Sequence, residues 1–192
     1  MFRKFYAPLC ALFICALMAS LPAHARRSAK RDHLTEQEAD LVREAQALDK
    51  RTDVFVRAAE RRLQAISGAT VVATTKKEQK EQEAWGPLPK GTRAELLADF
   101  AKILDEAINN IDDVAARDAK NPLVPKALRR LAAAVNAFAP QIETLRAQAR
   151  GGEELGAIED AINNMQQIVE AANRLPAPPP DKKDKGKKEK SR

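Results

Sequence analysis

The sequence has few of the residues that most enzyme and metal sites need. Its only cysteines, Cys10 and Cys15, lie in the first 25 residues, and His33 is the only histidine beyond them. Residues 26–192 can therefore form no disulfide, thiol nucleophile or C-x-x-C-H haem attachment. Zinc sites and di-iron helix bundles need several His or Cys ligands, so the sequence predicts neither.

Other catalytic patterns are also missing. Gly151-Gly152 follows a predicted helix and has no strand before it, unlike a phosphate-binding loop. A Ser-His-Asp triad would have to use His33, beside a basic segment at the edge of the predicted fold. Acidic residues are numerous but occupy mainly the polar positions of the predicted helices, which is typical of a solvated face. We therefore expect a non-enzymatic protein without a cofactor.

The first 25 residues have the three-part pattern of a secretory signal peptide. Basic residues in MFRKFY precede the apolar run APLCALFICALMASL, and PAHA supplies the small-x-small pattern of a signal-peptidase site. We expect residues 1–25 to be removed, the protein to be exported to the periplasm or outside the cell, and no membrane span to remain. An uncleaved anchor is the alternative, although the apolar run is short of the about 20 residues that span a bilayer.

The formal net charge of +6 is concentrated at the two ends of the chain. Segment 26–33 has four basic residues and one acid, and segment 181–192 has seven basic and three acidic, whereas 34–180 carries a net charge of −3. Basic ends favour contact with anionic membrane headgroups or envelope polymers; solvated, disordered ends are the alternative. The expected contacts are Arg26, Arg27, Lys182, Lys183, Lys187 and Lys188.

Apolar residues recur at helical spacing in four segments. Thr35 with Glu38 and Thr92 with Glu95 form capping boxes that mark two helix starts, and short links between the last three segments predict antiparallel neighbours. The expected fold is all-α, an antiparallel up-down four-helix bundle with a long crossover loop after the first helix. The expected segments are a basic arm 26–33, a bundle 34–175 with helices at about 35–66, 92–119, 124–149 and 153–175, and a disordered Pro/Lys-rich tail 176–192.

The third predicted helix is the most regular. Its apolar residues from Val124 to Leu145 alternate steps of four and three, the pattern of a coiled-coil seam. This seam can pack inside one chain or between two chains, so the sequence allows both a monomer and an oligomer. Pro140 lies opposite the seam and predicts a kink rather than a stop.

The crossover, residues 67–91, is the first place to look for a binding surface. Loops of this length are uncommon without a function or structure of their own, although a mobile crossover is the alternative. It contains KKEQKEQEAW, which could add a helical turn or two and ends at Trp85, the expected partner contact. Phe55, Phe100, Phe138 and Met165 should lie at one height as a core layer; a small apolar ligand pocket beneath Trp85 is the alternative.

The word AINN occurs twice, in LDEAINNIDD and in IEDAINNMQQ. Both copies fit acidic-flanked amphipathic helices with the asparagines outside, so neither predicts a site. We expect Ile108 and Ile162 to be buried, and Asn109 and Asn163 to be exposed. The arginines of RAAERR and LRRL should pair with acids on adjacent helices.

These patterns favour an exported protein that binds or scaffolds an envelope component, either a protein or an anionic surface. Nucleic acid fits poorly because the body is near neutral and aromatic residues make up only 4%. The alternative is a periplasmic holdase or adaptor that acts through residues 67–91 and the bundle surface. The segment LTEQE at 34–38 resembles the Leu-Thr-x-x-Gln motif of small periplasmic helical stress chaperones, but Glu38 stands where that motif has Gln.

Overall fold

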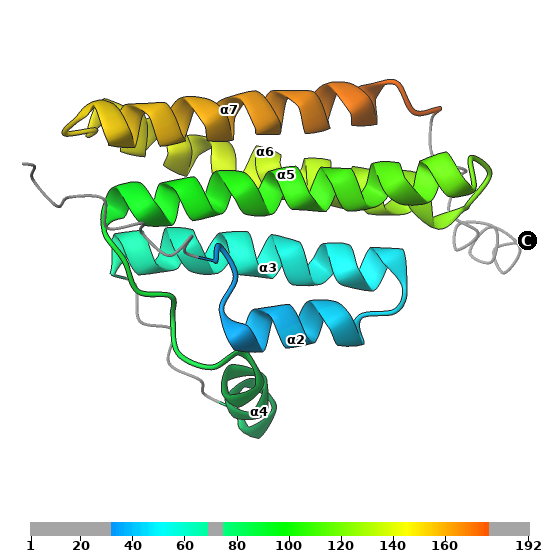
Figure 1. Ribbon diagram of the computed structural model, residues 1–192, viewed down its shortest axis with the longest axis horizontal. Helices are drawn as coiled ribbons and strands as arrows, with labels where there is room; N and C mark the ends of the chain where they lie inside the picture. Colours follow the sequence, from blue (N-terminus) through cyan, green and yellow to red (C-terminus); the bar gives the residue numbers. More distant parts are fainter. Residues whose placement is uncertain (1–31, 69–74, 177–192) are drawn as a thin grey trace, which may run out of the picture. The chain divides into compact units, whose positions relative to one another are not determined.

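The computed structural model describes residues 32–68 and 75–176, without the side chains of Lys77 and Glu81. In this part of the chain the fold is all-helical, as predicted, with no strand (Figure 1). The six helices are α2 (Glu36–Glu44), α3 (Leu48–Ser67), α4 (Lys76–Trp85), α5 (Arg93–Arg117), α6 (Leu123–Ala147) and α7 (Gly152–Asn173).

Several predictions fall outside the described residues. These are the signal peptide, most of the basic arm, most of the C-terminal tail and six of the seven expected contact residues. The six are Arg26, Arg27, Lys182, Lys183, Lys187 and Lys188.

Four long helices surround one apolar core. Helices α5 and α6 each pack against both α3 and α7, while α3 and α7 lie on opposite sides of the core. Consecutive helices α5 and α6 contact each other less than either contacts α3 or α7, which differs from the close pairing that their short link predicts. Because α5 and α6 lie on opposite sides of the core, the link between them, residues 118–122, crosses the end of the core. Buried side chains from all four helices fill it, including Phe55, Leu97, Phe100, Leu131 and Ile158.

The single helix expected over 35–66 is instead two helices. Helix α2 ends at Glu44 and α3 begins at Leu48, and α2 folds back along α3 (Figure 1). Ala45 and Ala47 have non-helical ψ angles of 86° and 138°, and Arg51 Nε donates to the Ala45 carbonyl at 3.1 Å. The apolar spacing continues across the break without glycine or proline, so periodicity gave no sign of it.

Helix starts and the central proline agree with the sequence pattern. The two predicted capping boxes, Thr35 with Glu38 and Thr92 with Glu95, are both present. Helix α6 continues through Pro140 without stopping. Of the expected core layer, Phe55, Phe100 and Met165 are buried, and Phe100 meets the half-buried Phe138 edge to face at 5.7 Å between ring centroids.

The two AINN copies lie as predicted only in part. Asn109 and Asn163 are exposed, as expected, but Ile108 and Ile162 are half-buried at the edge of the core. Asn164, expected outside, is half-buried and donates from Nδ2 to the Ala101 carbonyl at 2.9 Å. The core-facing stripe of α7 runs through Ala157, Ile158, Ala161, Met165 and Ile168, which leaves Ile162 at its margin.

Candidate functional site

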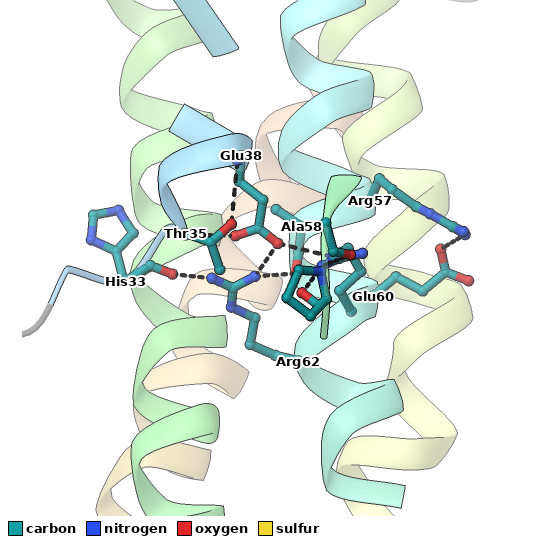
Figure 2. A network of polar contacts seen from close by, with 10 residues as sticks. His33, Thr35, Glu38, Arg57, Ala58, Glu60 and Arg62 are labelled. Atoms are coloured by element: carbon teal, nitrogen blue, oxygen red, sulfur yellow. Dashed lines mark hydrogen bonds and ion pairs between the residues drawn. The ribbon is translucent and has the colours of Figure 1, made fainter. Parts of the chain in front are cut away.

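A buried ionic cluster, which we call the Glu38 network, joins α2 to α3. It consists of Glu38 from α2 and Arg61 and Arg62 from α3, all at most 5% exposed. Glu38 Oε1 accepts from Arg61 Nε at 3.0 Å and from Arg62 Nη1 at 2.6 Å, while Oε2 accepts from the Thr35 backbone N–H at 2.9 Å. Figure 2 shows Glu38 pointing from α2 toward Arg62. One carboxylate therefore caps α2 and also pairs with two arginines of α3.

The same network holds the crossover. Arg61 Nη2 donates to the carbonyls of Gly86 and Pro87 at 3.2 and 2.5 Å. Its guanidinium carbon lies 5.5 Å from the centroid of the Trp85 ring, within the range of a cation–π contact. Trp85 is half-buried and packs against the core. The structure thus places Trp85 in a joint between α3 and the crossover.

Hydrogen bonds and nearby positive charges keep the buried Glu38 carboxylate ionised. Burial alone would raise the pKa of Glu38, but the hydrogen bond from Arg62, the Thr35 N–H and the charges of Arg62 and Arg61 hold that pKa below its ordinary value of 4.5. Burial lowers the pKa of Arg61, and Glu38 acts against this change. This carboxylate accepts hydrogen bonds from two guanidinium groups and one amide, so its role is to hold α2 against α3.

Some of the arginines pair with acids on adjacent helices, as predicted, but Arg57 does not. Arg61 and Arg62 pair with α2, and Arg130 pairs with Asp53 of α3, which confirms pairing across helices. Arg57 instead pairs within its own helix, with Glu60 at 2.7 Å. The sequence indicated only a capping role for Glu38, and nothing in the spacing indicated that its side chain is buried.

A groove between α6 and α7 is the second candidate, and we call it the α6–α7 groove. Its cavity volume is about 350 Å³. Its apolar lining comes from both helices, namely Val135, Ala139, Ile142, Ile162, Met165 and Val169. Its polar lining residues are Asn136, Glu143, Gln166 and Glu170, all exposed.

The electrostatics of this groove are one-sided. Its lining includes two carboxylates and no Lys, Arg or His. Glu170 is paired with Arg174 of its own helix at 3.5 Å, both largely exposed. In the described part of the chain no cation lies within ion-pair distance of Glu143. The groove therefore presents an apolar floor with negative charge at its edge.

Pro140 removes one helical hydrogen bond of α6 next to the groove. Proline has no backbone N–H, so the Asn136 carbonyl lacks the donor that it would have four residues later in an unbroken helix. Asn136 and Ala139 both line the groove beside this break. The small side chain of Ala139 leaves space there that a larger residue would fill.

The sequence pattern predicted a core layer and left a small apolar pocket beneath Trp85 as the alternative. The α6–α7 groove does include Met165 of the predicted core layer, but Trp85 is not in its lining. The small residue Ala139, on the face of α6 that lines the groove, was the available signal for this opening.

The described residues contain neither a group of metal ligands nor a membrane-spanning helix. No group of three or more His, Cys, Asp or Glu side chains there could hold a metal ion, and none of the helices seen is long and apolar enough to cross a membrane. Comparison of the chain with protein-family models, with curated proteins and with solved structures finds no match.

Proposed function

We propose that this is an exported, non-enzymatic protein that binds a component of the cell envelope through the α6–α7 groove. In this proposal residues 1–25 are a cleaved signal peptide, α3, α5, α6 and α7 form an up-down four-helix bundle, and the basic ends contact an anionic surface. The observation that carries the proposal is the groove, with its apolar floor and acidic edge.

The groove suits binding better than chemistry. Its lining has no Ser, Thr, Cys, His or Lys that could act as a nucleophile or base, and its two carboxylates, Glu143 and Glu170, are both exposed. Its volume of about 350 Å³ is at the small end for ligand pockets. Such a space accepts a few apolar side chains of a protein segment. Carboxylates at its edge favour a segment with positive flanks over an anionic ligand.

The holdase alternative has less support. A holdase needs exposed apolar surface for unfolded clients, and within the described residues Leu155, 43% exposed, is the only large apolar side chain on the surface. In the segment 67–91, α4 is rich in charged and amide residues, and its described side chains other than Trp85 are exposed. We therefore place the binding surface on α6 and α7.

Filling the groove tests the proposal. We expect Ala139→Trp to lower co-sedimentation of the exported form with envelope fractions by about tenfold, the size of effect that a central binding residue commonly has. Asn109→Trp, on an exposed position of α5, is the matched control and should bind normally. Circular dichroism checks that both variants fold.

A second variant guards against a folding defect at residue 139. Glu143 is exposed, so Glu143→Lys leaves the core intact. In a chain whose Lys182, Lys183, Lys187 and Lys188 are replaced by Gln, so that the tail does not contribute, it should still weaken envelope binding. Unchanged sedimentation of both groove variants would show that the groove is not the binding surface. If the purified protein then suppressed aggregation of a model client, the holdase function would replace this proposal.

A further inference from the structure

We propose that the C-terminal tail of this chain, residues 177–192, occupies the α6–α7 groove of the same molecule and competes there with the envelope partner. The inference rests on the proposed function for what the tail competes with. It rests on separate observations for where the tail binds. These are the point at which the chain leaves α7, the length of the tail, and the chemistry of the groove.

The chain remains bonded to α6 where it leaves α7. Helix α7 ends at Asn173, and the Pro176 carbonyl accepts a hydrogen bond from Arg129 Nη2 of α6 at 2.5 Å. Its last described residue is therefore bonded to α6, about 10 Å along that helix from Asn136, where the groove begins. Arg129, Asn136 and Glu143 are spaced seven residues apart, so they lie along one face of α6. The last two line the groove.

The tail is long enough to reach the groove. The seven helical residues from Arg129 to Asn136 span about 10 Å, and the next seven to Glu143 span about 10 Å more. An extended proline-rich chain advances about 3.1 Å per residue, so the four residues APPP at 177–180 cover about 12 Å. The remaining twelve residues are ample for the rest of the groove.

The chemistry of the tail matches that of the groove. Proline rings are apolar and need no hydrogen-bond donor satisfied, so APPP suits an aliphatic floor. Lys182 and Lys183 follow after Asp181 and would meet Glu143 and Glu170, where the groove lining itself has no cation. Single exposed ion pairs are weak. A tethered segment, however, has an effective concentration on the order of millimolar, which makes weak contacts sufficient.

The arrangement gives the tail two competing sites. Its lysines are the same residues that are expected to contact an anionic envelope surface. A tail held by such a surface leaves the groove open, and a tail in the groove blocks it. The partner segment should therefore bind best where the envelope surface is anionic.

Disulfide trapping in the full chain tests the location. Cys10 and Cys15 are replaced by Ser, and Lys183→Cys is combined with Gln166→Cys in the groove. The control pair combines Lys183→Cys with Asp112→Cys. Asp112 is exposed on α5, which packs beside α7 and runs in the same direction (Figure 1), so the tail can reach it as well. We expect the groove pair to form its disulfide at least about fivefold faster than the control pair. Equal rates would overturn the proposal.

Charge reversal tests the chemistry. Glu143→Lys with Glu170→Lys should slow trapping of the groove pair to the control rate. Glu44→Lys with Asp105→Lys changes the net charge equally at exposed positions outside the groove, and should leave the rate unchanged. A trapping rate insensitive to the groove carboxylates would contradict the proposal. None of these measurements contains an envelope component, so their failure and a failure of envelope binding are separate results.

Discussion

At the scale of single residues, Glu38 does more than its sequence position indicates. It closes the capping box of α2, and it is also the counter-ion of two buried guanidinium groups. A buried ion pair contributes little net stability compared with apolar packing, but removal of one partner leaves a charge buried without compensation. The residue should therefore tolerate almost no substitution.

We expect Glu38→Gln to lower the free energy of unfolding by about 3 kcal/mol, because Arg61 and Arg62 then lose their only buried counter-charge in the described cluster. Urea unfolding followed by circular dichroism measures the loss. Glu36→Gln is the matched control, since Glu36 lies in the same first turn but is exposed, and it should cost less than about 1 kcal/mol. Equal effects of the two substitutions would mean that capping, rather than charge compensation, is what Glu38 provides.

The same residue predicts a dependence of stability on pH. The folded-state pKa of Glu38 lies below its ordinary value of 4.5, so its ionisation stabilises the fold above about pH 4.5. That contribution is lost as the pH falls through the folded-state pKa. The difference in unfolding free energy between the wild type and Glu38→Gln should thus be constant near neutral pH and shrink below pH 4.5. A difference that stays constant down to pH 3 would contradict this assignment.

At the scale of elements, the crossover is attached through a few specific contacts. Among the described helices α4 packs only against α2, and the turn after it is held by Arg61. That turn requires Gly86, whose φ of 62° and ψ of −169° lie in a region essentially restricted to glycine. A Cβ at this position would also lie 3.2 Å from the Gln37 side chain.

We expect Gly86→Ala to destabilise the attachment of the crossover by about 2 kcal/mol, through backbone strain and the clash with Gln37. Trp85 is the only tryptophan of the chain, so its fluorescence emission reports directly on this joint and should shift to the red. A variant with unchanged emission and unchanged stability would show that the turn is not under this constraint.

Gly156→Ala is a control with the same chemical change, and it should have the opposite effect on protein stability. Gly156 lies exposed inside α7, and a Cβ there meets nothing within 4 Å. Alanine has the higher helix propensity, so this substitution should stabilise the protein by about 0.5–1 kcal/mol. It should leave the emission of Trp85 unchanged.

Sequence periodicity predicted most of the helices but not the break between α2 and α3 or the way the helices pack. Spacing and capping residues predicted the helical class and the starts of α2 and α5, because these depend on local chemistry. The break at Ala45–Ala47 was missed because α2 is held back along α3 by contacts between residues distant in sequence, such as Glu38 with Arg61 and Arg62. The groove was missed for the same reason, since it forms only where side chains of α6 and α7 meet.

At the scale of the whole molecule, the two proposals couple the groove to the charged end of the chain. If the tail is partly held in the groove, only the free fraction can contact an anionic surface. The apparent affinity for such a surface is then reduced by that fraction. Freeing the tail should raise the affinity, whereas removing its lysines should lower it.

We therefore expect Glu143→Lys with Glu170→Lys to raise binding of the exported form, residues 26–192, to phosphatidylglycerol vesicles by at least about threefold. Each lysine near an anionic surface contributes about 1 kcal/mol, so replacing Lys182, Lys183, Lys187 and Lys188 by Gln should lower binding more than tenfold. Vesicle sedimentation measures both. The added positive charge alone would also favour binding, and Glu44→Lys with Asp105→Lys corrects for it. If this matched variant binds as strongly as the groove variant, net charge explains the increase and the tail is not held in the groove. If the groove variant binds more strongly, the increase comes from release of the tail.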